Sequence, residues 1–108
     1  MMTTNWATAQ LTDGALSRPI GTYAFGQTST GAGIRNFPYS TNLSINPLTY
    51  ANMGTGTIGT EIHNIGEILC VTLWDMTWGI IQQVGSINPN IFDGTNAGGN
   101  SIALKLEL

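Results

Sequence analysis

The fold of this chain is decided by residues 61–84, which read EIHNIGEILCVTLWDMTWGIIQQV. Apolar residues recur in this stretch with the spacing of an α-helix, and they form two separate stripes. One stripe contains positions 62, 65, 69, 73, 76 and 80, and the other contains positions 68, 71, 74, 78, 81 and 84. A helix that is apolar on two faces is typical of a buried central helix. We therefore expect one long buried helix, with Thr60 as its N-cap, Glu61 in its first turn and Gly85 just past its end.

A second, shorter helix is expected over residues 101–108, with Asn100 as its cap. Residues 1–60 are rich in Gly, Thr, Asn and Ser and show only weak helical periodicity, which predicts a mostly irregular N-terminal half. The local expectations there are a ragged helix end over residues 2–11, a short strand over Thr22–Phe25, a helical turn that begins at Asn46 and Pro47, and a loop over residues 53–60.

These elements predict a mainly α chain that forms a single partial domain over residues 1–108. The long helix needs partners on both of its apolar faces, and residues 1–60 can cover only one of them. We therefore expect an exposed apolar patch and self-association.

The composition argues against two classes of partner. Only 8% of the residues are charged, the formal net charge is −3, and Lys and Arg number three, so there is no basic patch for a nucleic acid. Glu67 and Asp75 interrupt the apolar residues 62–84, and a charge near a bilayer centre costs roughly 2.5–3.5 kcal/mol, so no membrane span is expected. Residues 1–4 do not have the pattern of a signal peptide, and the sequence itself assigns no compartment.

Two features that could carry chemistry are better explained structurally. Cys70 is the single cysteine, which excludes an intrachain disulfide, and its place in an apolar helix predicts a small buried side chain. The glycines at 54, 56 and 59 match the spacing of a dinucleotide-binding loop, but no strand precedes them, so a flexible loop is expected.

His63 and Glu67 share a helix face because they are four residues apart. Two residues supply at most two metal ligands, whereas catalytic zinc sites usually use three, so no metal site is expected in this chain. His63 is then either a structural or a catalytic histidine. A stand-alone hydrolase that uses His63 with Glu67 is the least favoured alternative, since no serine or cysteine lies in a recognisable nucleophile motif.

Arg35 is one of the three cations and stands among apolar and aromatic residues. A rigid guanidinium suits either an anchor for backbone carbonyls or a clamp for a substrate. The residue types alone favour the anchor.

Five segments resemble, in order and spacing, segments of the fungalysin-type secreted zinc metalloendopeptidases. They are residues 3–6 (TTNW), 33–41 (GIRNFPYST), 46–50 (NPLTY), 61–67 (EIHNIGE) and 98–104 (GGNSIAL). The resemblance covers nearly the whole chain. It implies the mostly helical C-terminal lobe of a thermolysin-like catalytic domain, in a family that is extracellular and uses zinc.

The resemblance also implies roles for individual residues. His63 matches the histidine that donates a hydrogen bond to the oxyanion of the tetrahedral intermediate, an interaction worth roughly 3–4 kcal/mol in comparable sites. Arg35 matches the arginine that holds a substrate carbonyl, and Ile34 would lie near the primed-side pocket. An aspartate that orients the histidine in thermolysin is replaced here by Ile58, so either Glu61 or Glu67 orients His63 instead, or no residue does.

No His-Glu-x-x-His occurs, because His63 is the only histidine. The resemblance therefore implies a truncated lobe with no cofactor of its own that is inactive in proteolysis alone. Its expected partners are the missing N-terminal lobe or further copies of itself, and in the parent enzyme a peptide substrate. The alternative is a stand-alone, non-catalytic module that forms homo-oligomers or binds another protein.

Overall fold

The computed structural model describes residues 4–56 and 58–108. Two α-helices, α1 (Ile62–Val84) and α2 (Gly99–Glu107), follow three short 3-10 helices, η1 (Asp13–Ala15), η2 (Thr22–Phe25) and η3 (Tyr50–Asn52). Within the described residues there is no strand, and a single antiparallel bridge joins Arg18 to Tyr39. The prediction of a mainly α chain, with one long helix, one short helix and a loop-rich N-terminal half, is confirmed.

The first turn of α1 is built differently from the expectation. Glu61, rather than Thr60, is the N-cap: its backbone is extended (φ −69°, ψ 130°) and its carboxylate accepts the N–H of Asn64 at 2.9 Å. A side-chain acceptor at this position satisfies one of the N–H groups that a helix start leaves free. Gly85 ends α1 as expected, in the left-handed region at φ 75°, with its N–H bonded to Ile81 O.

The expected strand over Thr22–Phe25 is wrong, because this segment is η2. It lies between Gly21 and Gly26, which both adopt left-handed backbone angles (φ 72° and 63°). The chain therefore reverses at each end of the segment, which leaves no extended run to pair with another strand.

The helical turn expected at Asn46 begins later, at Tyr50, with Thr49 as its N-cap. Asn46 is buried and uses its side chain elsewhere: its amide donates to Pro38 O at 2.9 Å, and its oxygen accepts from Leu48 N at 3.1 Å. A side chain that bridges two backbone groups in this way favours an irregular loop over a helix.

The other end-of-helix expectations also need correction. α2 begins at Gly99, two residues before the expected start, and Asn100 lies inside it rather than capping it. Residues 4–11 contain turns and no helix, while residues 2 and 3 of that expected helix end lie outside the described residues. The described part of residues 53–60 is a loop, as predicted.

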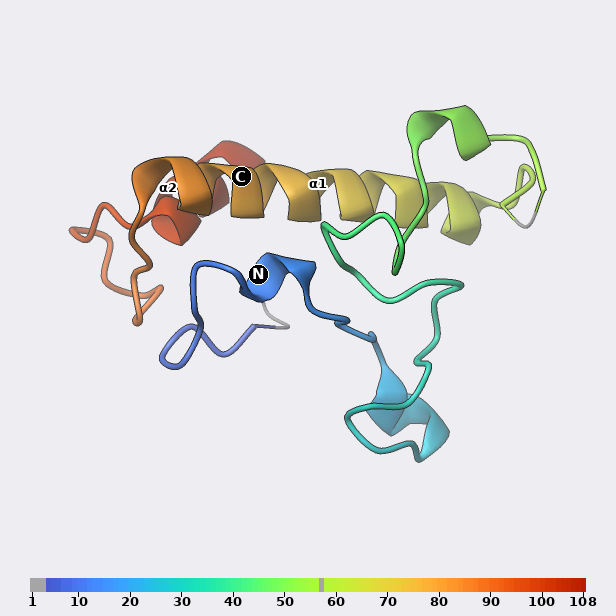
Figure 1. Ribbon diagram of the computed structural model, residues 1–108, viewed down its shortest axis with the longest axis horizontal. Coiled ribbons are helices and arrows are strands. Elements are labelled where there is room, and N and C mark those ends of the chain that lie inside the picture. Colours follow the sequence, from blue (N-terminus) through green and yellow to red (C-terminus); the bar gives the residue numbers. More distant parts are fainter. Residues whose placement is uncertain (1–3, 57) are drawn as a thin grey trace.

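One stripe of α1 forms the core. Trp74, Trp78 and Ile81 pack with Trp6 into one buried cluster, and Ile68 and Val71 pack with Leu48 and Ile58 into a second. In Figure 1 residues 4–40 (blue to teal) run along one side of α1, the green segment with η3 lies on the opposite side near the helix start, and α2 lies beside the C-terminal part of the helix.

The second apolar stripe of α1 is left partly open. Ile62 and Leu69 are 75% and 61% exposed, and positions 65, 73, 76 and 80 are half-buried. We call these six positions the open stripe. It fits the expectation that residues 1–60 cover only one side of the helix. No described helix has the length and hydropathy needed to cross a membrane.

The contact between η1 and α1 gives a test of the packing. A Cβ on Gly14 would lie 2.4 Å from Cγ of the buried Trp78, and Gly14 O accepts the indole N–H of Trp74 at 3.0 Å. We expect Gly14→Ala to lower the free energy of unfolding by about 1–3 kcal/mol, as overpacking does.

Gly79→Ala is the matched control, measured by urea unfolding followed by circular dichroism. Gly79 lies in α1, and a Cβ there would meet nothing within 4 Å, so alanine should stabilise by up to about 1 kcal/mol. Equal effects of the two substitutions would contradict the described packing of η1 on α1.

Candidate functional site

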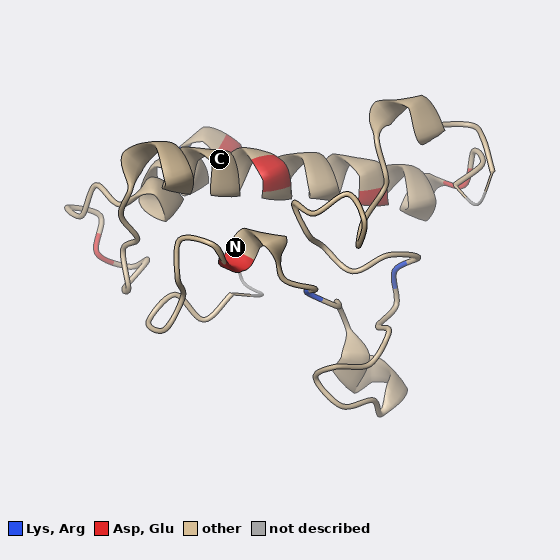
Figure 2. Ribbon diagram, in the orientation of Figure 1, with Lys and Arg blue, Asp and Glu red and all other residues tan. Residues whose placement is uncertain are grey.

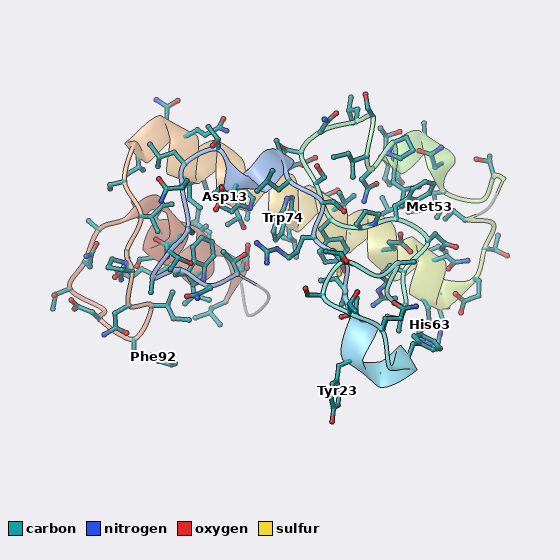
Figure 3. All side chains as sticks on the ribbon, turned by 60° about the horizontal axis from the view of Figure 1, so that its bottom comes forward. Asp13, Tyr23, Met53, His63, Trp74 and Phe92 are labelled. Atoms are coloured by element: carbon teal, nitrogen blue, oxygen red, sulfur yellow. The ribbon has the colours of Figure 1, made fainter. Side chains whose placement is uncertain are left out.

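His63 lies in the first turn of α1, and its side chain is 76% exposed. Its Nδ1 is 2.6 Å from Oε1 of Glu61, while Oε2 of the same carboxylate accepts the N–H of Asn64. Figure 3 shows His63 at the end of α1, away from Trp74 in the middle of the helix. One carboxylate thus caps the helix and holds the histidine ring.

This contact decides which ring nitrogen can act on another molecule. A carboxylate at Nδ1 keeps a proton on that nitrogen, so Nε2 is the atom left to face a ligand. Nε2 donates a hydrogen bond only when the ring is protonated, and Glu61 then supplies the compensating negative charge. The hydrogen bond from His63, with that from Asn64 N–H, holds the pKa of Glu61 below its usual range.

Arg35 is half-buried, and its guanidinium lies beside His63. One terminal nitrogen of Arg35 donates to the backbone carbonyl of His63 at a long 3.4 Å, and its buried Nε has no hydrogen-bond partner. Among the residues described, the only ion pair joins His63 to Glu61, so no carboxylate neutralises Arg35. Arg35 therefore contacts a backbone carbonyl, as the anchor interpretation expects, and keeps donor capacity for another acceptor.

Tyr39 and Cys70 lie behind Arg35, in contact with each other. Burial, together with the Cys70 thiol, raises the pKa of Tyr39 to about 12, and the nearby charge of Arg35 acts in the opposite direction. Cys70 is half-buried rather than fully buried as expected. Tyr39 and Cys70 border a cavity of about 160 Å³ that is also lined by Trp6, Trp74, Trp78 and Glu107. His63 and Arg35 do not line it.

Ile34 is 48% exposed and precedes Arg35 in the same loop. Its backbone N–H donates to Ile20 O at 2.8 Å, and its side chain covers Gly21, where a Cβ would lie 3.0 Å from it. Ile34 is therefore held by its backbone and leaves part of its side chain open beside Arg35.

The two candidates for orienting His63 lie in different surroundings. Glu61 contacts the ring, whereas Glu67 is 1% exposed and its carboxylate accepts N–H groups of Asn36 and Phe37. Sequence reasoning missed Asn36 as a partner of Glu67. The available signal was the acid itself, since a carboxylate on a buried helix face must find hydrogen-bond donors.

The described residues do not fit a zinc site. They contain no group of three His, Cys, Asp or Glu side chains that could hold a metal ion. His63 has its Nδ1 against Glu61, and the carboxylate of Glu67 is occupied by backbone and amide N–H groups.

Comparison with known proteins places the chain in a family. Residues 1–108 match the family described as Fungalysin metallopeptidase (M36). The chain belongs to the fungalysin metallopeptidases. The resemblance carried by the five sequence segments is thereby confirmed.

Two fungal relatives show the level of similarity. Extracellular metalloproteinase 2 of Trichophyton tonsurans is 38% identical over 79 residues, which cover 70% of this chain and 12% of that protein. Extracellular metalloproteinase 4 of Arthroderma otae is 37% identical over 94 residues, which cover 80% of this chain and 14% of that protein. The chain thus spans only a small part of the length of these relatives.

The contact between Glu61 and His63 predicts a pH dependence of stability. Because the folded-state pKa of Glu61 is depressed, its contribution to stability is present above the unfolded value of about 4.3 and is lost as the pH falls through the folded value. Glu61→Gln should therefore lose less stability on acidification than the wild type does.

The same contact can be measured directly by NMR titration of the Glu61 carboxyl carbon. We expect a pKa below about 4.3 in the wild type and a return toward that value in His63→Gln, which removes the largest cause of the shift. An identical Glu61 titration in the two proteins would show that the contact does not persist in solution.

Proposed function

We propose that this chain supplies the oxyanion-stabilising histidine, His63, and the substrate-binding arginine, Arg35, of a fungalysin-type metalloendopeptidase site. The observation that carries the proposal is the hydrogen bond from Arg35 to the backbone carbonyl of His63, because it brings both donors to one end of α1. Membership of the metallopeptidase family supports it.

The chemistry follows from what each group has free. Nε2 of a protonated His63 would donate to the oxygen of the attacked peptide carbonyl, where negative charge develops only in the transition state. Arg35 would hold a neighbouring substrate carbonyl, and Ile34 would contact a side chain on the primed side. Glu61 would hold the His63 ring and balance its charge.

The proposal includes inactivity of the chain on its own. Hydrolysis by this family needs a metal and an activated water, and the described residues provide no set of ligands for a metal. Those groups would come from another part of a peptidase domain. The relatives are named as extracellular, and we propose the same site of action here.

A chimaera tests the proposed roles. Residues 1–108, which match the family throughout, would replace the corresponding segment of extracellular metalloproteinase 4 of Arthroderma otae, whose match covers 80% of this chain. With casein as substrate, we expect His63→Ala to lower kcat by about 10²–10³ without loss of zinc, as removal of an oxyanion donor does. Arg35→Ala should lower kcat/KM, and Arg18→Ala, which removes the other arginine, should not.

The isolated chain completes that test. We expect it to show no hydrolysis of casein with zinc added. Hydrolysis that His63→Ala abolishes would overturn the proposed inactivity, and a chimaera insensitive to His63→Ala and Arg35→Ala would overturn the proposed roles.

We also propose that the open stripe of α1 packs against the remainder of a peptidase domain. The stripe is apolar, Ile62 and Leu69 are exposed on it, and the relatives are several times longer than this chain. Burial of such a stripe stabilises an interface, and its exposure in the isolated chain favours association.

Sedimentation velocity tests the open stripe. We expect the isolated chain to self-associate and Leu69→Lys to weaken this association while the helical circular dichroism is retained. Leu43→Lys is the matched control, because Leu43 is 64% exposed but lies in a loop and is not part of the open stripe. A monomeric wild type would contradict the prediction, and a defined oligomer with cooperative melting would support the alternative of a stand-alone oligomeric module.

A further inference from the structure

Glu67 is a buried carboxylate that binds the loop of residues 31–38 rather than another charged residue. Its Oε1 accepts the backbone N–H of Phe37 at 2.8 Å, and its Oε2 accepts the backbone N–H and the side-chain amide of Asn36, both at 3.1 Å. Only 1% of Glu67 is exposed, and no cation lies within ion-pair distance among the described residues.

The position of this acid in α1 makes the arrangement informative. The sequence of α1 contains no Lys or Arg, and its two acidic residues interrupt an otherwise apolar helix (Figure 2). Burial of a carboxylate is costly unless hydrogen bonds replace the lost water. Three N–H donors from residues 36 and 37 provide that replacement. The carboxylate in turn gives these donors an acceptor.

Hydrogen bonds hold this loop before and after residues 35–37: Ile34 N–H donates to Ile20 O, and the Asn46 amide donates to Pro38 O. Residues 31–38 form no helix or strand, and their backbone N–H groups must therefore find partners outside secondary structure. Arg35, the residue before Asn36 and Phe37, donates through its side chain to His63 O at a long 3.4 Å and also hydrogen-bonds to Tyr39. Glu67 attaches the loop to α1 at the two residues that directly follow Arg35.

We infer that Glu67 is the positioning residue that fixes Arg35 relative to His63. Glu67 lies four residues after His63 on α1, and its carboxylate binds the two residues that follow Arg35. A second contact, from the Asn36 amide to the Asn64 side-chain oxygen at 2.9 Å, joins the same loop to the same turn of the helix. This inference rests on the proposed function, because it assigns Arg35 and His63 to one site.

The negative charge of Glu67 matters as well as its shape. Hydrogen bonds to an ionised acceptor are roughly twice as strong as neutral ones. A glutamine at this position keeps the volume but turns an amide NH₂ toward N–H groups, so at least one donor of residues 36 and 37 is left without an acceptor.

Backbone amide exchange in the isolated chain directly tests the hydrogen bonds from Asn36 and Phe37 to Glu67. In Glu67→Gln we expect the N–H groups of Asn36 and Phe37 to exchange about tenfold faster or more, as loss of a hydrogen bond to a charged acceptor implies, with the amides around Trp74 unchanged. Asp75→Asn removes a carboxylate from the same helix and should change neither group. Unchanged exchange at Asn36 and Phe37 would overturn the inference.

Kinetics of the chimaera then test the positioning role. We expect Glu67→Gln to lower kcat/KM of the chimaera that keeps Arg35. In the chimaera that already carries Arg35→Ala, it should lower kcat/KM no further, because the effects of coupled residues are not additive. Full additivity would mean that Glu67 supports only the fold and would overturn the inference.

The two proposals fail in different ways. If Arg35→Ala leaves kcat/KM unchanged while Glu67→Gln speeds amide exchange at Asn36 and Phe37, the proposed function is rejected. The role of Glu67 in holding the loop is then kept. If Glu67→Gln does not fold, Asn36→Ala is the second variant to measure, because it removes one of the three hydrogen-bond donors and keeps the buried Glu67. It should speed exchange at Phe37 and couple to Arg35→Ala, and the absence of both effects would overturn the inference.

Discussion

Irregular backbone can be buried only where something other than a helix or sheet satisfies its hydrogen bonds, and side chains of α1 do this for two of the segments packed on it. The indole N–H of Trp74 in α1 donates to Gly14 O, and the carboxylate of Glu67 in α1 accepts from the backbone N–H groups of Asn36 and Phe37. A side chain from a regular helix thus replaces the strand that would otherwise pair with each loop. The apolar contacts of the same helix face then hold those loops in place.

Buried asparagines satisfy backbone groups of the loops in the same way. Asn46, Asn88 and Asn100 are buried to within 1% of full burial, and each uses its amide on backbone groups. Asn100 accepts from Asn88 N and donates to Asn88 O, which ties α2 to the loop after α1. An amide can donate and accept at once, so it satisfies loop backbone without the desolvation cost of a charge.

The sequence predicted the parts of the fold that depend on local pattern. The apolar periodicity of residues 61–84 located α1, and Gly85 located its end. The positions of α2 and of the helical turn near Tyr50 were shifted because Asn100 and Asn46, both good caps, are instead bound to distant backbone. That choice depends on tertiary contacts, which a single sequence does not reveal.

For the candidate site as well, the sequence predicted the residues but not the contacts between them. The resemblance singled out His63 and Arg35, but two acids were equal candidates to orient His63, and spacing alone favoured neither. The structure separates them because Glu67 faces the loop at Asn36 and Glu61 reaches the ring of His63.

The helix itself shows why an acid is needed at that end of α1. A cation in the first turn of a helix is disfavoured by the positive end of the helix dipole, and a protonated His63 would lie there beside Arg35, which has no carboxylate partner among the described residues. The position that corresponds to the histidine-orienting aspartate of thermolysin is Ile58, which is 2% exposed and packs with Ile68 and Val71 in the core. A carboxylate at Ile58 would lose this packing, whereas Glu61 lies in solvent and already caps the helix. On the proposed function, Glu61 at the helix cap supplies the charge that compensates a protonated His63, and Ile58 remains free to pack in the core.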